Sequence, residues 1–139
     1  MLCIDLSGKR ALITGSTRGI GKAIAEFLAK AGAKVVITGR DSSKAEDVAK
    51  SLSDSFGVEA LGVAMDMGKE ESIREAYAKI ENAWGGVDIL INNAGITRDK
   101  LFLRMSLEDW EEVIRVNLTC TFLWHSFWQA LPCCGPQFL

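Results

Sequence analysis

The sequence has few of the features that mark membrane, secreted or nucleic-acid-binding proteins. Its 139 residues include only two prolines, one histidine and one tyrosine, and 16 basic residues stand against 18 acidic ones. A net charge of -2 gives no basic field that would attract a phosphate backbone, so we expect no nucleic-acid partner. The longest apolar stretch, near 122–131, is too short to span a bilayer. The charged pair Lys9-Arg10 follows too soon for a signal peptide, so we expect a cytoplasmic protein without membrane contact.

The cysteines form no recognisable framework. Cys3, Cys120, Cys133 and Cys134 lack C-x-x-C spacing, and the adjacent pair 133–134 would form only a strained bridge. Alternatively, Cys120, Cys133 and Cys134 could bind a metal together with His125, but their spacing matches no common ligand pattern. We interpret them as buried or incidental thiols and expect neither a structural disulfide nor a metal site.

Short aliphatic runs alternate with longer helical patterns from residue 9 onward. The runs have the composition of parallel strands that are covered on both faces, so all four are predicted to be central in a sheet. The predicted strands are Arg10–Thr14, Lys34–Thr38, Ala60–Met65 and Val87–Asn92. The length fits one domain, and the alternation predicts an α/β fold with a doubly wound parallel sheet of about four strands.

Four helices are predicted between and after these strands: 20–31, 43–56, 72–84, and 106 to Pro132. In the first, apolar residues recur at helical spacing at Ile20, Ala23, Ile24, Phe27, Leu28 and Ala31. Gly32 and Gly57 stand where left-handed caps would end the first two helices. Ser43 and Ser106, each with an acidic residue three positions on, predict capping boxes that open the second and fourth helices.

A glycine-rich turn joins the first strand to the first helix. It reads Thr14-Gly15-Ser16-Thr17-Arg18-Gly19-Ile20-Gly21. Small residues let the backbone approach a pyrophosphate, while the amide groups and the dipole at the helix start favour negative charge. We predict that residues 15 to 21 bind a dinucleotide, which makes the fold Rossmann-type. The alternative is that the glycines serve only a tight structural turn.

The end of the second strand indicates which dinucleotide is bound. An acidic residue in this place would bond the ribose of NAD, but the sequence reads Thr38-Gly39-Arg40. Arg40, with Arg18 in the turn, can bond a 2'-phosphate, so NADP(H) is the expected cofactor. The alternative is that both arginines are solvated surface charges, and Asp41 beside Arg40 is the feature that opposes the prediction.

The turn and the segment Asn92-Asn93-Ala94-Gly95 after the fourth strand together resemble the short-chain dehydrogenase/reductase family. The segments Ile96–Asp99 and Leu103–Met105 are most similar to the bacterial 3-oxoacyl-[acyl-carrier-protein] reductases within it. The resemblance covers Leu6 to about Phe122. It implies NADPH-dependent reduction of a 3-oxoacyl thioester on acyl-carrier protein to the 3-hydroxyacyl product, as in fatty acid biosynthesis.

The resemblance also implies roles for individual residues. Asp66 and Met67 would lie beside the adenine, and Asn93, Ala94 and Gly95 would lie along the cofactor. Asn117 would belong to a catalytic tetrad of asparagine, serine, tyrosine and lysine. Two alternatives stay open, since Asp66 could be a helix cap and Asn117 an ordinary exposed helical residue.

Of that tetrad only Asn117 is present. The single tyrosine, Tyr77, lies upstream of the Asn-Asn-Ala-Gly motif and has Glu81 rather than lysine four residues later. We interpret Tyr77 as a packing residue and expect the 139-residue chain to be inactive alone, because acid-base groups are needed beyond a bound cofactor. The family homotetramer, which uses the last helix here and one that is absent, is expected to be impaired.

The sequence divides into residues 1–123, an NADP-binding half-domain, and residues 124–139, a divergent tail. The tail holds two of the four tryptophans and two of the four cysteines but no charged residue, which suggests an altered reading frame, an alternative terminus or a truncated gene. Strand 87–92 would be an open edge, and the chain poorly soluble, unless the tail covers it. The candidates for that cover are Phe127, Trp128, Leu131 and Phe138. A noncatalytic NADP(H)-binding module and a nonfunctional gene product are the alternatives to an oxidoreductase.

Overall fold

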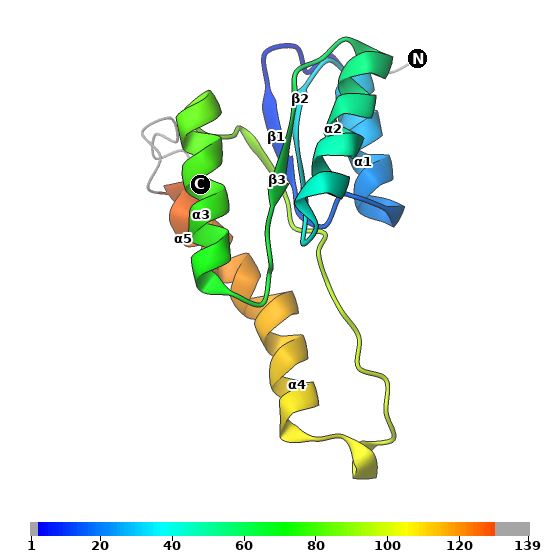
Figure 1. Ribbon diagram of the computed structural model, residues 1–139, viewed down its shortest axis with the longest axis vertical. Coiled ribbons are helices and arrows are strands. Elements are labelled where there is room, and N and C mark those ends of the chain that lie inside the picture. The colour runs from blue at the N-terminus through cyan, green and yellow to red at the C-terminus, as the bar shows by residue number, and fades with distance from the viewer. Residues whose placement is uncertain (1–2, 130–139) are drawn as a thin grey trace.

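The computed structural model describes residues 3–129, which form one four-stranded parallel sheet with helices on both faces (Figure 1). The strands are β1 (Arg10–Ile13), β2 (Lys34–Gly39), β3 (Ala60–Ala64) and β4 (Ile89–Ile91), in the order β3-β2-β1-β4. The α-helices are α1 (Gly19–Lys30), α2 (Ser42–Phe56), α3 (Glu70–Trp84), α4 (Leu107–Ile114) and α5 (Cys120–Gln129). Two short helices complete the set, η1 (Phe102–Arg104) and the π-helical η2 (Arg115–Thr119). The predicted doubly wound fold is confirmed.

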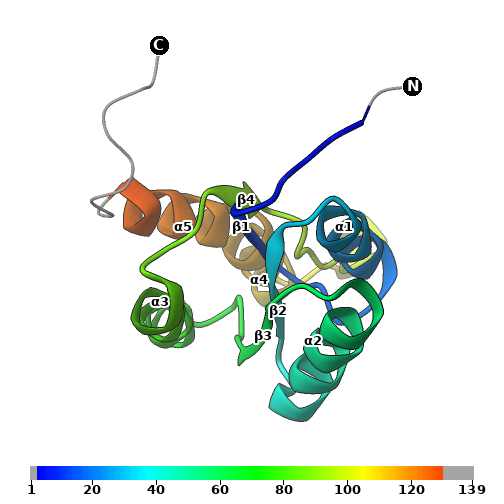
Figure 2. The ribbon, with the colours of Figure 1, turned by 90° about the horizontal axis from the view of Figure 1, so that it is seen from above.

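The helices sort into two layers. In the view from above, α1 and α2 lie on one side of the sheet and α3 and α5 on the other (Figure 2). Alternate strand residues point to opposite faces. Ile13 and Ile37 therefore pack with the alanines of α1 and α2, while Leu12 and Val36 pack with α3 and α5. Each layer buries its own apolar cluster, as expected for parallel strands that are covered on both faces.

Two of the four strands are less central than the sequence predicts. All four residues of β2 from Val35 to Thr38 are buried, but β3 and β4 lie at the two edges of the sheet and are mostly half-buried. An edge strand has a neighbour on one side only, which explains the difference. Within the described residues β4 pairs with β1 alone.

Helix α1 buries a different face from the apolar stripe in the sequence. Gly21, Ala25 and Ala29 are the buried residues, whereas Ile20 is 75% and Phe27 59% exposed. Residues four positions apart share one helix face, and three small side chains on that face let α1 lie close to the sheet. The helix is therefore as predicted, but its packing face is set by its smallest residues.

The helix ends agree with the sequence in part. Gly32 and Gly57 adopt the predicted left-handed conformation after α1 and α2, with φ of +94° and +66°. The capping box predicted at Ser43 is wrong, because Asp41 caps α2 by accepting a hydrogen bond of 3.2 Å from the Lys44 amide. The capping box at Ser106 is confirmed.

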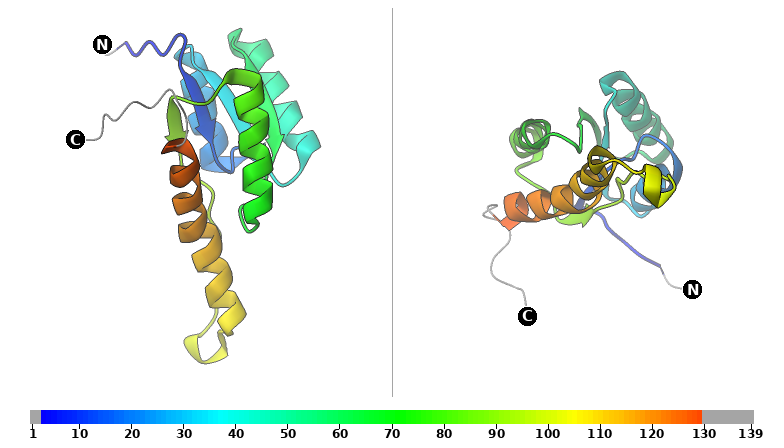
Figure 3. Two further views of the ribbon diagram at one scale, coloured as in Figure 1. Left: turned by 90° about the vertical axis from the view of Figure 1, so that its left-hand side faces the viewer. Right: turned by 90° about the horizontal axis from the view of Figure 1, so that it is seen from below.

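The last predicted helix consists of three consecutive helical segments, called the helical column below. Helices α4, η2 and α5 follow one another without a break, and the α4 end extends well beyond the sheet (Figure 3). Pro132, at which this helix is predicted to end, lies outside the described part of the chain. No helix among residues 3–129 is long and apolar enough to cross a bilayer.

The boundary predicted between residues 123 and 124 falls inside α5. Trp124 is only 3% exposed and packs in the cluster beneath α3, so the first tail residues are part of the core. Phe127 packs there too, with its ring centroid 5.7 Å from that of Tyr77. The side chain of Trp128 and residues Leu131 and Phe138 lie outside the described part.

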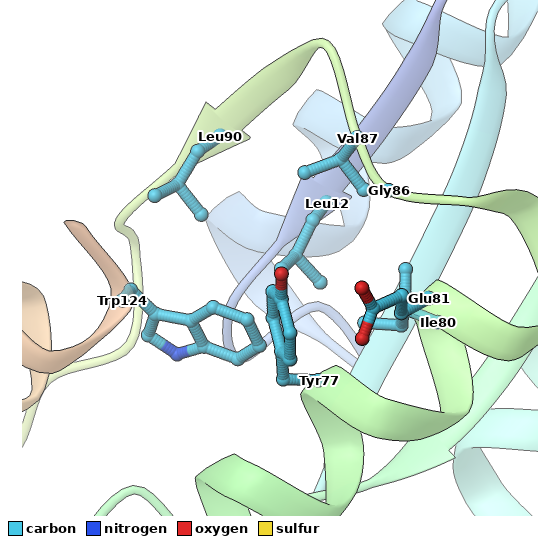
Figure 4. A pocket seen from close by; sticks show the side chains of 8 residues that line it. All are labelled: Leu12, Tyr77, Ile80, Glu81, Gly86, Val87, Leu90 and Trp124. Atoms are coloured by element: carbon cyan, nitrogen blue, oxygen red, sulfur yellow. The ribbon is translucent and has the colours of Figure 1, made fainter. Parts of the chain in front are cut away.

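Tyr77 is a packing residue, as predicted. It packs against the core cluster and lies between Trp124 and Glu81 in a small apolar hollow between α3, α5 and the sheet (Figure 4). Gly86 and Val87 close this hollow at the amino-terminal end of β4. The only tyrosine of the chain is thus placed at the opposite end of β4 from the Asn-Asn-Ala-Gly segment.

Candidate functional site

Every site residue that the sequence predicts on a turn lies just beyond the carboxyl end of a strand. The glycine-rich turn follows β1, Arg40 follows β2, Asp66 and Met67 follow β3, and residues 93–95 follow β4. Parallel strands bring their carboxyl ends to one edge of the sheet, the lower end in Figure 1. The chain reverses its winding direction between β1 and β4, which is where open α/β sheets bind ligands.

The end of β4 holds the glycine-rich turn in place. The Thr14 hydroxyl accepts hydrogen bonds from the Asn93 and Ala94 amides at 3.0 and 2.9 Å. The Asn93 side-chain amide in turn donates to the carbonyl oxygens of Thr14 and Gly15 at 3.0 and 3.1 Å. Asn93 therefore shapes the site through the backbone of the turn.

Two glycines of the turn are needed for this close packing. A Cβ on Gly15 would lie 3.1 Å from Ala94, and Gly15 has a φ of +64°. A Cβ on Gly21 would overlap the Gly15 carbonyl oxygen and come within 2.5 Å of the Asn93 side-chain nitrogen. The first turn of α1 can therefore approach the strands only because position 21 has no side chain.

The amino-terminal end of α1 is open. Its N-cap residue, Arg18, has extended backbone and makes no side-chain capping bond, whereas Asp41 and Ser106 cap α2 and α4. Arg18, Gly19 and Ile20 are all exposed. Free amide groups and the positive end of the helix dipole thus face solvent beside a basic side chain, an arrangement that favours an anion.

Arg18 and Arg40 supply positive charge on this edge. Both are exposed, and neither side chain makes a hydrogen bond or ion pair with any residue in the described part of the chain. Asp41, the feature that opposed the cofactor prediction, is engaged elsewhere, because it caps α2 and lies 3.9 Å from the Lys44 ammonium. The two guanidinium groups are therefore available for a phosphate.

Ser16 faces the protein interior, unlike the exposed residues Arg18, Gly19 and Ile20 of the turn. It is fully buried, and its hydroxyl donates to the Ile13 carbonyl oxygen and accepts from the Thr38 amide. Thr17 is half-buried against Gly39, whose Cβ, if present, would lie 2.6 Å from the Thr17 methyl carbon. Ser16 thus supports the turn from inside the protein.

Asp66 and Met67 form the turn between β3 and α3. Asp66 is not the N-cap of α3, which is Lys69; its carboxylate accepts from the Gly68 amide at 2.9 Å, and its own amide donates to the Ser72 hydroxyl. Met67 is buried, and its carbonyl oxygen contacts the Cys120 sulfur. Burial raises the pKa of the Cys120 thiol, and the Asp66 carboxylate raises it further, so the thiol stays protonated.

Asn117 lies in η2 and binds the loop after β4. Its side-chain oxygen accepts from the Ile96 amide at 2.8 Å, and its nitrogen donates to the Ile96 carbonyl oxygen at 2.9 Å. A Cβ on Gly95 would lie 3.3 Å from the same side-chain oxygen. Asn117 is exposed, as that alternative expects, but its side chain also fixes the path of the loop beside the candidate site. Its catalytic role stays a prediction.

Sequence reasoning missed Thr14 and Thr38 as site residues. Both are fully buried and use their hydroxyls to tie the turns together. A polar residue at the end of an aliphatic strand was the available signal, since a buried hydroxyl needs a hydrogen-bond partner.

The sequence matches known proteins over most of its length. Residues 9–132 match the family described as short chain dehydrogenase. The 3-oxoacyl-[acyl-carrier-protein] reductase of Aquifex aeolicus is 61% identical over 120 residues, which are 86% of this chain and 48% of that protein. The Escherichia coli reductase of the same name is 44% identical over 86% of this chain and 47% of its own. The chain thus spans about half the length of the curated relatives it matches.

Solved structures agree in fold and family. L-sorbose reductase from Gluconobacter frateurii, complexed with NADPH and L-sorbose, superposes with a TM-score of 0.88 at 34% identity over 92% of this chain and 49% of that one. Gluconate 5-dehydrogenase from Burkholderia cenocepacia, in complex with NADP and tartrate, gives 0.83 at 39% identity over 90% and 49%. Together with the site geometry, these matches show that the chain belongs to the short-chain dehydrogenase family.

Proposed function

We propose that this chain binds NADP(H) at the carboxyl edge of its sheet. The observation that carries the proposal is the open amino-terminal end of α1 with Arg18 and Arg40 beside it, neither of which pairs with a residue among 3–129. A pyrophosphate needs amide donors and close backbone approach, which residues 15 to 21 supply. The 2'-phosphate that distinguishes NADPH from NADH needs positive charge, which the arginines supply.

The other turns complete the proposed cofactor site. The loop at Asp66 and Met67 would lie beside the adenine, and residues 93–95 along the nicotinamide half. A bound nicotinamide cofactor supplies the hydride chemistry, while the protein supplies binding and orientation. The solved relatives that superpose on this chain were crystallised with NADPH or NADP, which supports the same cofactor here.

The proposed parent reaction is the NADPH-dependent reduction of a 3-oxoacyl thioester on acyl-carrier protein to the 3-hydroxyacyl thioester, a step of fatty acid biosynthesis. Its support is the 61% and 44% identity to reductases named for that reaction. Those relatives are about twice as long as this chain, so acyl-carrier protein as partner remains part of the proposal. A cytoplasmic location also remains a prediction, as does impaired assembly of the family homotetramer.

The 139 residues acting alone should bind the cofactor without turnover. Tyr77 lies in the apolar hollow at the far end of β4, with Glu81 rather than lysine four residues on. Both polar atoms of the Asn117 side chain are engaged by Ile96. A noncatalytic NADP(H)-binding module is the second candidate, favoured by the packing of Trp124, 3% exposed, in the core cluster.

Titration of the chain with NADPH, followed by cofactor fluorescence, tests the proposal. Arg40→Ala and Arg18→Ala should each weaken binding about tenfold or more, as expected for a charge-assisted hydrogen bond. Arg74→Ala is the matched control, since Arg74 is an exposed arginine of α3 that pairs with Glu70. Absence of saturable binding by the folded chain would defeat the proposal.

A separate assay tests the absence of turnover. NADPH absorbance is followed with the chain and a 3-oxoacyl thioester, with a full-length relative as the positive control. We expect no oxidation above background because Tyr77, the only tyrosine, lies in the apolar hollow and cannot act as the acid at the candidate site. Measurable reduction by the purified chain would show that another group takes that role.

A further inference from the structure

Two buried hydroxyl groups join the turn after β1 to the end of β2. Ser16 and Thr38 are each 0% exposed. Both hydroxyls donate to the same acceptor, the Ile13 carbonyl oxygen, at 2.8 and 3.0 Å. The Ser16 hydroxyl also accepts from the Thr38 amide at 2.9 Å, and the Thr38 hydroxyl accepts from the Gly15 amide at 3.1 Å.

The backbone completes this network. The Ser16 amide donates to the Thr38 carbonyl oxygen at 2.9 Å. Every hydroxyl is used as both donor and acceptor, so the network has one satisfied arrangement, and a buried network of that kind holds its members rigidly. We call Ser16 and Thr38 with these bonds the hydroxyl lock.

Each arginine lies close in sequence to one residue of the hydroxyl lock. Arg18 follows Ser16 by two residues, and Arg40 follows Thr38 by two residues. Between them, Thr17 packs on Gly39 so closely that a Cβ on Gly39 would lie 2.6 Å from the Thr17 methyl carbon. The backbone that carries one arginine is therefore fixed against the backbone that carries the other.

We infer that Ser16 and Thr38 are positioning residues for cofactor selectivity. They hold Arg18 and Arg40 so that one 2'-phosphate can meet both guanidinium groups. The inference rests on the proposed binding of NADP(H). NADH shares the pyrophosphate, which the amides at the start of α1 receive, but has no group that requires both arginines at once. Loss of the hydroxyl lock therefore raises the free-energy cost of ordering the two arginines, and this cost weakens the binding of NADPH rather than that of NADH.

The test compares dissociation constants for NADPH and NADH. Thr38→Val keeps the shape of the side chain and removes its hydroxyl. It should weaken NADPH binding about tenfold, the size of one net hydrogen bond, and NADH binding less than about twofold. Thr38→Ser restores the hydroxyl and should restore the ratio of the two constants. Thr119→Val is the control, because Thr119 is an exposed threonine of η2.

A double-mutant cycle makes the coupling explicit. In an Arg40→Ala background, Thr38→Val should no longer change NADPH affinity beyond its small effect on NADH. Ser16→Ala repeats the test from the other turn if circular dichroism shows that Thr38→Val is unfolded.

Equal weakening of NADPH and NADH by the folded variants would overturn the inference and leave a merely structural lock. Independence of the Thr38 and Arg40 effects would overturn it as well. A folded wild-type chain that binds neither nucleotide would instead defeat the proposed function on which the inference rests.

Discussion

Gly21 shows how one missing side chain shapes the candidate site. Its Cα lies so near the Gly15 carbonyl oxygen and the Asn93 side chain that a methyl group would overlap both. The same glycine begins the buried face of α1, so it serves helix packing as well as the turn. A single residue thus links β4, the glycine-rich turn and the helix.

Gly21→Ala should destabilise the fold by about 2 kcal/mol, because overpacking a tight contact costs more than the gain in helix propensity. Urea denaturation measures the change. Gly57→Ala is the comparison, since Gly57 has a left-handed backbone but open space around it, so its cost of about 1–2 kcal/mol is conformational only. A Gly21→Ala variant as stable as the wild type would show that the turn can move away from α1.

Glycine spacing predicted the tight packing of the turn at Gly15 and Gly21. Arg18 and Arg40 are exposed near it, and their role in binding stays a prediction. The buried roles of Ser16, Thr14 and Thr38 could not be predicted, because a hydroxyl in a turn has the same sequence signal whether it faces a ligand or a carbonyl oxygen inside the protein. Only the register between β1 and β2 decides which way it faces.

Helix α4 is held to the preceding loop by charged side chains. Its first turn is fixed by the Ser106–Asp109 capping box, and the Lys100 ammonium lies 2.7 Å from the Asp109 carboxylate. Arg98 similarly bonds Glu112. These pairs hold the loop after β4 against α4, which otherwise extends away from the sheet (Figure 3).

The stability of α4 should depend on pH in the acid range. The hydrogen bond from Lys100, with that from the Ser106 amide, lowers the pKa of Asp109 from 3.8 to about 2. Because the pKa of Asp109 is lower in the folded form, its carboxylate stabilises that form fully at pH values above its pKa in the unfolded chain. This contribution is lost as the pH falls from about 4 to about 2. Backbone chemical shifts of residues 107–114 should lose helical character over that range.

Asp109→Asn should remove that pH dependence, so residues 107–114 should be less helical than in the wild type above pH 4 and change little below it. Glu111→Gln is the control on the same helix, because Glu111 is exposed. An unchanged acid transition in Asp109→Asn would assign the effect to another carboxylate.

Element types and their order were predictable because aliphatic runs and helical spacing repeat clearly. The packing face of α1 and the cap of α2 were not. For α1, tertiary contact decided the packing face, because the sheet accepts its small residues. For α2, a second local signal decided the cap, because Asp41 precedes the helix and Ser43 lies inside its first turn.

At the scale of the whole molecule, apolar surface is concentrated away from the Rossmann-type core. The outer edge of β4 is unpaired within the described residues, and the loop and helical column that follow it carry several exposed apolar side chains. They are Leu101, Phe102, Leu103, Leu107, Trp110, Leu118 and Phe122. An unpaired strand edge and exposed apolar side chains together favour association or aggregation.

The chain should therefore self-associate at micromolar concentration, as light scattering after size exclusion would show. Phe102→Ser combined with Leu103→Ser should reduce this association with little effect on stability, because these side chains are 87% and 96% exposed. Phe27→Ser is the control on the opposite layer. A wild-type chain that stays monomeric would contradict the prediction.

The carboxyl edge of this sheet is expected to select NADPH over NADH. The most direct measurement is calorimetric titration of the folded 139-residue chain with NADPH and, separately, with NADH. NADPH should bind at least about tenfold more tightly than NADH, because Arg18 and Arg40 are expected to meet the 2'-phosphate. Equal affinity for the two nucleotides, or binding of neither, would contradict it.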